Sequence, residues 1–140
     1  MNISARVASA GGTHLACVET NSVVRNVPIP AKAQGAGSSV NGGELLFLAL
    51  ATCFCNDVYR EAAKRDLVVD RVEVDVNGEF DADGDARNIR YRTEIASNAP
   101  RDALANLVRY VDQIAEIHPA VRTGTPVELA EVTIHAGAVP

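Results

Sequence analysis

The amino-acid sequence predicts an α+β fold with mainly antiparallel strand pairing. Two groups of short segments, within residues 1–28 and 72–95, alternate apolar and polar residues around hairpin turns. Residues 41–64 begin with helix-capping residues, and residues 100–118 have apolar side chains at helical spacing. A further alternating segment, 127–134, predicts a closing strand. The expected order of elements is therefore β-β-β-α-β-β-α-β, with a long central helix.

Length, charge and cysteine content indicate a single-domain protein and exclude several functional classes. The chain has 140 residues, enough for a single domain over residues 1–140 with its own core. Its 13 Lys and Arg against 18 Asp and Glu give a net charge of −5, the wrong sign for binding nucleic acid or an anionic membrane. The longest apolar stretch, 45–55, is much shorter than the roughly 20 residues that span a bilayer. Three cysteines and no signal-peptide pattern predict free thiols in the cytoplasm.

Residues 1–28 predict three short antiparallel strands. Gly11-Gly12 is the signal of a two-residue hairpin turn, and polar residues 20–22 mark a second turn. Residues 28–40 are rich in Pro, Gly, Ala and Ser and have no periodicity. We therefore expect a surface loop between the third strand and the first helix.

The first helix is predicted over residues 41–64. Asn41 can accept a hydrogen bond from the backbone N–H of Glu44, and Glu44 can accept one from Asn41, which is the geometry of a capping box. The first half of the helix, 45–55, is apolar on every side and must be covered all round. Because a chain of this length offers little cover, we expect a second copy to supply part of it across a two-fold axis.

Residues 72–95 predict a hairpin with one buried face. After it, Pro100 opens a second helix whose apolar residues recur every three or four positions. Pro119 is expected to stop this helix, because proline disrupts a helix interior. His118 would then lie at the end of the apolar face.

Cys53 is the first candidate for chemistry. Cys55 lies about 200° away on the helix and cannot form a disulfide with it. Asp57 and Arg60 fall on the same side of the helix as Cys53, and Arg60 is long enough to reach a thiolate two turns back. The competing interpretation is that Cys53 is an inert, buried residue that packs as a small apolar side chain.

His118 is the second candidate. An inward-facing imidazole must find partners for both ring nitrogens, and a core histidine with satisfied hydrogen bonds is one interpretation. If the two helices bring His118 to Cys53, the imidazole can take the thiol proton instead.

Neither a metal nor a cofactor is predicted. Asp81, Asp83 and Asp85 have the spacing of a calcium loop, but Ala86 and Arg92 stand where that loop needs Gly and Glu. The histidines and cysteines show no zinc-site spacing, and the glycines form no phosphate-binding loop.

Two segments carry a resemblance to a known family. The run GGELLFLALATCF over residues 42–54 and the helix end AEIHP over residues 115–119 resemble the OsmC/Ohr family of osmotically inducible and organic-hydroperoxide-resistance proteins. The similarity extends over nearly the whole chain. It implies an intertwined homodimer in which two long central helices are sandwiched between sheets, with two thiol sites at the subunit interface.

The resemblance also implies roles for particular positions. Cys53 matches the cysteine that attacks the hydroperoxide in the peroxidase members. His118 stands where those members have a second, resolving cysteine, and Thr13 stands where the organic-hydroperoxide branch has its activating arginine. The glutamate of that branch falls at Gly43, one place before Glu44.

The leading hypothesis is an OsmC-like thiol peroxidase that reduces organic or hydrogen peroxides in defence against oxidative stress. Because the resolving cysteine is absent, an external thiol is expected to complete the cycle, unless Cys17 or Cys55 reaches the site. The predicted catalytic residues are Cys53, His118, Arg60 and Glu44, with Arg25 and Arg122 as alternative sources of the cation.

Two other functions stay open. In the first, the chain is a diverged dimer of the same fold that binds a small apolar ligand beside His118 without peroxidase activity. In the second, Cys53 and His118 form a site for acyl transfer or hydrolysis.

Overall fold

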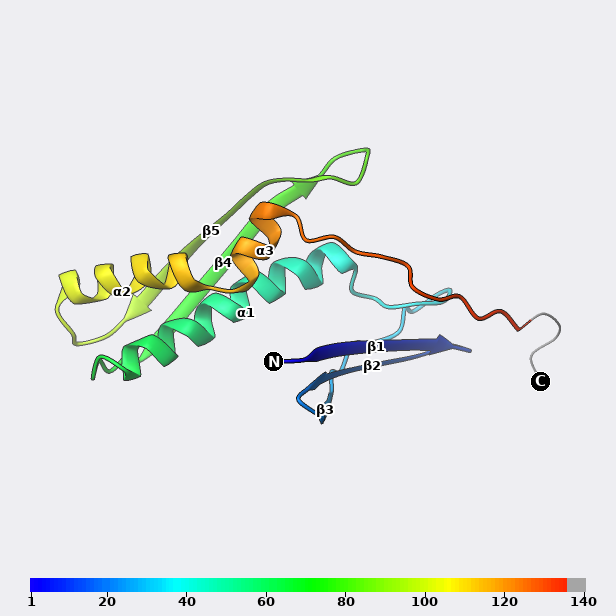
Figure 1. Cartoon of the computed structure of the whole chain (residues 1–140), viewed down its shortest axis with the longest axis horizontal. Helices are drawn as coiled ribbons and strands as arrows, with labels where there is room; N and C mark the ends of the chain where they lie inside the picture. Colours follow the sequence, from blue (N-terminus) through cyan, green and yellow to red (C-terminus); the bar gives the residue numbers. More distant parts are fainter. Residues whose placement is uncertain (136–140) are drawn as a thin grey trace. The chain divides into compact units, whose positions relative to one another are not determined.

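The computed structural model describes residues 1–135 (Figure 1). The order of elements through α2 is the predicted β-β-β-α-β-β-α, and the α+β class is confirmed. In chain order the elements are β1 (Ile3–Ala10), β2 (Thr13–Thr20), β3 (Val23–Asn26), α1 (Gly42–Ala63), β4 (Arg71–Phe80), β5 (Ala86–Ala96), α2 (Arg101–Ile114) and α3 (Ile117–Thr123).

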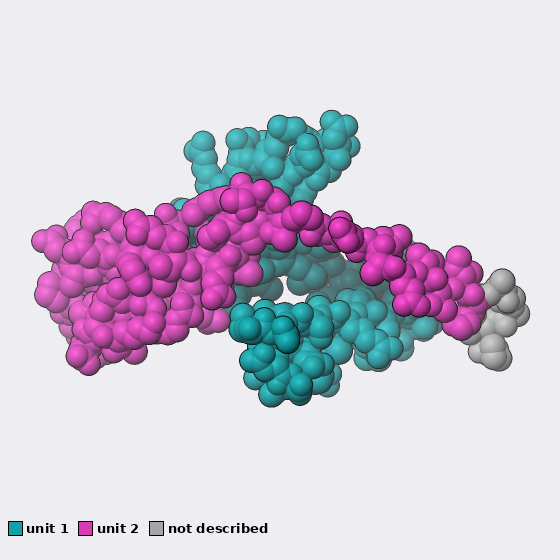
Figure 2. All heavy atoms as spheres, in the orientation of Figure 1, with its two compact units in different colours: residues 1–52, 73–94 teal, residues 53–72, 95–140 magenta. Residues whose placement is uncertain are grey.

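The chain divides into two compact units, which Figure 2 colours separately. Unit 1 comprises residues 1–52 and 73–94, and unit 2 comprises residues 53–72 and the chain from residue 95 onward. Helix α1 and the hairpin β4–β5 contribute residues to both units. Each unit is described by itself below.

Strands β1, β2 and β3 form an antiparallel sheet in unit 1, as predicted. The turn between β1 and β2 is made by Gly11 and Gly12, whose φ angles are 54° and 81°. Both angles are positive, as a type I′ hairpin turn requires, and glycine adopts them without steric cost. The register pairs Ile3 with Thr20 at one end and Ala10 with Thr13 at the turn.

The predicted capping box begins helix α1. The backbone N–H of Asn41 donates to the Glu44 carboxylate at 2.7 Å, and the backbone N–H of Glu44 donates to Asn41 Oδ1 at 2.9 Å. These bonds satisfy donors that the first turn of a helix leaves without partners. The helix then continues to Ala63, one residue short of the predicted end.

Strands β4 and β5 form a two-stranded sheet, and in unit 1 the end of β4 packs against the first half of α1. The rings of Phe47 and Phe80 stack with their centroids 5.8 Å apart. Two glycines make room for this contact, because a Cβ atom at Gly43 would lie 2.8 Å from the Phe80 ring and one at Gly78 would lie 2.8 Å from the Phe47 ring. Small residues at both positions therefore allow the helix to approach the strand.

The core of unit 2 lies between the second half of α1 and helix α2. Buried apolar residues recur every four positions on each helix, so that each helix presents a single apolar stripe. They are Phe54, Val58 and Ala62 on α1, and Leu107, Val111 and the C-cap residue Ala115 on α2.

The predicted end of the second helix is wrong. Helix α2 ends at Ile114, where Ala115 turns extended with φ −60° and ψ 111°. The chain then forms α3, and Pro119 lies in the first turn of this new helix rather than stopping the old one. Proline is tolerated there because the first N–H groups of a helix have no partner within it. His118 consequently belongs to α3.

The predicted strand over residues 127–134 is also wrong for the described chain. Residues 124–135 contain neither helix nor strand. The apolar side chains of this segment are mostly in solvent, with Val127 96%, Leu129 85% and Ile134 80% exposed. The alternation that predicts a strand is present, but no neighbouring strand pairs with it within residues 1–135.

Replacing Gly78 with alanine tests the packing in unit 1. The new Cβ would meet Phe47, the Ile89 side chain at 3.1 Å and the Arg87 carbonyl oxygen at 3.2 Å. We expect Gly78→Ala to lower the free energy of unfolding in urea by about 1–3 kcal/mol. Gly42→Ala is the matched control, because nothing lies within 4 Å of its Cβ position. An equal effect of both changes would contradict the packing described here.

Candidate active site

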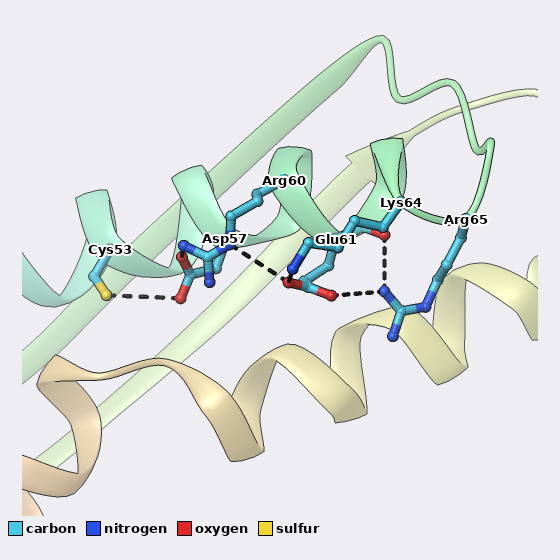
Figure 3. Close-up of polar contacts among 6 residues, drawn as sticks. All are labelled: Cys53, Asp57, Arg60, Glu61, Lys64 and Arg65. Carbon is cyan, nitrogen blue, oxygen red and sulfur yellow. Dashed lines mark hydrogen bonds and ion pairs between the residues drawn. The ribbon is translucent and has the colours of Figure 1, made fainter.

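The thiol of Cys53 lies on α1 beside a buried carboxylate (Figure 3). Cys53 Sγ donates a hydrogen bond to Asp57 Oδ2 at 3.8 Å, one helical turn further along. The distance exceeds that of an N–H or O–H hydrogen bond because sulfur is larger and a weaker donor. Asp57 is only 4% exposed, whereas Cys53 is half-buried. The thiol is therefore next to a proton acceptor that is almost completely shielded from water.

The other oxygen of Asp57 is paired with a cation. Asp57 Oδ1 accepts from Arg60 Nη1 at 2.7 Å, and Arg60 Nε also lies 3.4 Å from Glu61 Oε1. Arg60 is thus connected to Cys53 through Asp57 (Figure 3). A thiol, a buried carboxylate and a guanidinium in series are an arrangement that can activate a nucleophile, since an adjacent base can take its proton.

Glu61 extends the ionic network along α1. Its side chain is 3% exposed and accepts from Lys64 Nζ at 2.7 Å and from Arg65 Nη1 at 2.9 Å. These hydrogen bonds, the one from Lys64 first, lower the pKa of Glu61 to about 2. The guanidinium of Arg65 also lies 4.5 Å from the ring centroid of Tyr110 on α2. Glu61 is therefore ionised at neutral pH and links the end of α1 to α2.

His118 lies in unit 2 on α3 and is 5% exposed. Its ring packs against Phe54, the neighbour of Cys53 in the chain, with ring centroids 6.0 Å apart. Burial lowers the pKa of His118, and the positive charge of Arg122 lowers it further, while Asp112 and Asp57 act in the opposite direction. The imidazole is therefore neutral at pH 7. Asp57 accepts a hydrogen bond from Cys53 and also affects the pKa of His118, so this carboxylate is common to both candidate residues.

The predicted site residues do not all lie in the same unit. Cys53, Arg60 and His118 belong to unit 2, whereas Glu44 caps α1 in unit 1. Arg122 donates to Asp112 at 2.9 Å and affects the pKa of His118. Of the two alternative cations, Arg122 belongs to unit 2 and Arg25 to unit 1.

Asp57 is the functional candidate that sequence reasoning did not assign. Its spacing of four residues from Cys53 was a usable signal, since residues at this separation are neighbours on a helix surface. The sequence pattern predicted Arg60 as the partner instead, because a cation is the usual partner of a reactive thiol. The ion pair between Arg60 and Asp57 explains why the carboxylate occupies the position next to the sulfur.

Residues 1–135 contain no group of three or more His, Cys, Asp or Glu side chains that could hold a metal ion. All three cysteines are free thiols and half-buried. In the same part of the chain, none of the helices has the length and apolar character needed to cross a membrane.

Comparison with known proteins identifies the family. Residues 35–130 match the family described as OsmC-like protein. The chain belongs to this family. The resemblance noted in the sequence is thereby confirmed, and the OsmC-like fold with it. No curated protein matches the chain.

Several solved structures share the fold at low sequence identity. The OsmC-like protein of Mycoplasma pneumoniae is 15% identical, with a TM-score of 0.62 and coverage of 88% of this chain and 87% of that one. A hypothetical protein of Aquifex aeolicus is 16% identical, with a TM-score of 0.64 and coverage of 89% and 90%. The organic hydroperoxide resistance protein of Bacillus subtilis is 17% identical, with a TM-score of 0.53 and coverage of 89% and 93%.

The lowered pKa of His118 predicts a pH dependence of stability. The unfolded chain takes up a proton on His118 near pH 6.5, while the buried imidazole of the OsmC-like fold resists it. Stability contributed by His118 is therefore lost as the pH falls below 6.5, by at most about 1.4 kcal/mol per pH unit. We expect this slope to be smaller in His118→Asn, measured by urea unfolding between pH 7.5 and 5.5. An imidazole that titrates above pH 6.5 by NMR would contradict the assignment.

Proposed function

We propose that this OsmC-like protein reduces organic hydroperoxides or hydrogen peroxide through Cys53, in defence against oxidative stress. The observation that carries the proposal is the hydrogen bond from Cys53 Sγ to Asp57, a buried carboxylate whose second oxygen is paired with Arg60. This arrangement supplies both a nucleophile and an acceptor for its proton. Structural similarity to organic hydroperoxide resistance proteins supports the same chemistry.

In the proposed reaction, Asp57 takes the proton of the Cys53 thiol as the sulfur attacks the peroxide. The S–O bond forms while the O–O bond breaks, so sulfur is oxidised and the peroxide is reduced. The proton passes from Asp57 to the departing alkoxide, which leaves as an alcohol. The products are Cys53 sulfenic acid and one molecule of alcohol, or water when the substrate is hydrogen peroxide.

An external thiol completes the proposed cycle. Two molecules of a small or protein thiol reduce Cys53 sulfenic acid, which yields Cys53 thiol, one disulfide and one water. Cys55 cannot resolve the intermediate directly, because it lies about 200° from Cys53 around α1. Where the peroxidase members are expected to have a second cysteine, this chain has His118, which packs on Phe54.

The remaining predicted residues receive supporting roles. Arg60 holds Asp57 in place through the 2.7 Å ion pair, and neutral His118 closes the apolar side of the site beside Phe54. Glu44 is proposed to stabilise the start of α1 rather than to contact the peroxide, because its carboxylate is engaged in the capping box. The three free cysteines support function in a reducing compartment, for which we propose the cytoplasm.

We also propose that the chain functions as a homodimer. Leu48 on α1 is 58% exposed, and the apolar residues of segment 127–134 are in solvent. Exposed apolar surface of this extent is costly in water and is typical of subunit interfaces. A second copy would cover it without any change to the elements described.

The peroxidase proposal predicts that Cys53 is the only cysteine needed for turnover. With cumene hydroperoxide as substrate and dithiothreitol as reductant, Cys53→Ser should reduce peroxide consumption to the uncatalysed background. Asp57→Asn should lower the rate by about a hundredfold, because it removes the proton acceptor. Cys55→Ser is the matched control and should retain the wild-type rate, since Cys55 is an equally half-buried thiol on the same helix.

Mass spectrometry after a stoichiometric dose of hydroperoxide gives an independent measure of sulfenic acid formation at Cys53. Dimedone should label Cys53 of the wild type rapidly and should label Asp57→Asn slowly, because sulfenic acid formation precedes any reductant. Turnover that survives in Cys53→Ser, or labelling no faster than that of a free thiol, would remove the proposed activity and favour ligand binding without catalysis.

The dimer proposal predicts a mass of twice 14.8 kDa by light scattering during gel filtration. Leu48→Glu should shift this mass toward the monomer, because it places a charge in the surface that the second copy covers. Gln113→Glu, an exposed substitution on α2, should leave the mass unchanged. A wild-type chain that is monomeric at all concentrations would contradict the proposal.

A further inference from the structure

One face of the three-stranded sheet in unit 1 carries a row of three side chains that the peroxidase proposal does not use. Arg6 on β1 pairs directly with Cys17 on β2, and Cys17 pairs directly with Asn26 on β3. Residues directly opposite each other in antiparallel strands project to the same face, with Cβ atoms about 4.5–5.5 Å apart. A guanidinium, a thiol and an amide therefore lie side by side.

This row lines a cavity of about 870 Å³. The rest of the lining is mainly apolar and comes from β1, β2 and the segment after β3, including Leu15, Val27 and Ile29. That segment is held by the hydrogen bonds from Val27 N–H to the Ala16 carbonyl and from Ile29 N–H to the Val27 carbonyl, both 2.9 Å. A mostly apolar cavity with a few polar groups is typical of small-molecule sites, which measure about 300–1,000 Å³.

The one charged side chain of the lining has unused bonding capacity. Within residues 1–135, the side chain of Arg6 takes part in no ion pair or hydrogen bond. Leu15 is 70% exposed although it lines the cavity. The cavity therefore presents one cation and an apolar surface, both without a partner.

We propose that this cavity binds an amphipathic carboxylate, with its head group at Arg6 and Asn26 and its tail against Leu15, Val27 and Ile29. The single guanidinium balances one negative charge, and its planar fork matches the two oxygens of a carboxylate. The apolar lining accepts a hydrocarbon tail and removes Leu15 from water. The proposal does not depend on chemistry at Cys53, which belongs to unit 2.

The reactivity of Cys17 reports whether the cavity is occupied, because Cys17 lies in the lining between Arg6 and Asn26. Dodecanoate, below its micellar concentration, is the probe, and alkylation of each cysteine by iodoacetamide is followed by peptide mass spectrometry. At ten times the dissociation constant, dodecanoate should slow alkylation of Cys17 about tenfold. Cys53 and Cys55, which lie outside unit 1, are internal controls and should react at unchanged rates.

Two variants test the head-group contact. Arg6→Gln should weaken dodecanoate binding about ten- to hundredfold, because it removes a charge-assisted hydrogen bond, and Arg6→Lys should restore part of the affinity. Arg25→Gln is the matched control, since Arg25 pairs with Val18 and thus lies on the opposite face of the same sheet. Dodecanol, which has the tail without the charge, should bind wild type and Arg6→Gln equally.

Three results would overturn the proposal. One is the absence of Cys17 protection by dodecanoate in a wild type whose fold is verified by circular dichroism. Another is equal protection by dodecanol and dodecanoate, which would leave no role for Arg6. The third is protection of Cys17 without any ligand that increases with protein concentration, which would mean that a second copy of the chain occupies the cavity.

Discussion

Two buried carboxylates on α1 each need a cationic partner, and the rest of unit 2 depends on this constraint. Asp57 and Glu61 lie one turn apart on the side of the helix that also carries the core residues, and both are almost fully buried. A buried charge without a partner costs several kcal/mol, so Arg60, Lys64 and Arg65 must stay beside them. This requirement fixes which face of α1 turns inward, and it fixes the position of Cys53, one turn before Asp57.

The elements that sequence analysis predicted correctly are those with local causes. The capping box at Asn41 and the turn at Gly11-Gly12 depend on residues within three positions of each other, so their pattern is sufficient. The strand predicted over 127–134 depends on a partner that the alternation itself does not specify. Pro119 is equally compatible with the end of one helix and the first turn of the next, which is why the end of α2 was misplaced.

In the candidate site too, contacts within one element could be predicted from the sequence, and contacts between elements could not. Helical periodicity was enough to place Asp57 beside Cys53 and Arg60 beside Asp57, because the three residues share one element. The contact between His118 and Phe54 joins two helices that are distant in the sequence. It depends on the break at Ala115 that begins a new helix, and no periodicity within α2 contains that information.

The charged side chains near Cys53 have the same net charge before and after the proposed reaction. Asp57 and Glu61 contribute two negative charges, and Arg60, Lys64 and Arg65 contribute three positive ones, which leaves a net charge of +1 in this cluster (Figure 3). When the thiol proton moves to Asp57 and then leaves with the alcohol, the cluster returns to the same charge. No proton has to be exchanged with water during the step. A buried acceptor such as Asp57 can therefore serve the thiol without being open to solvent, and its low exposure is compatible with a part in the chemistry as well as in the fold.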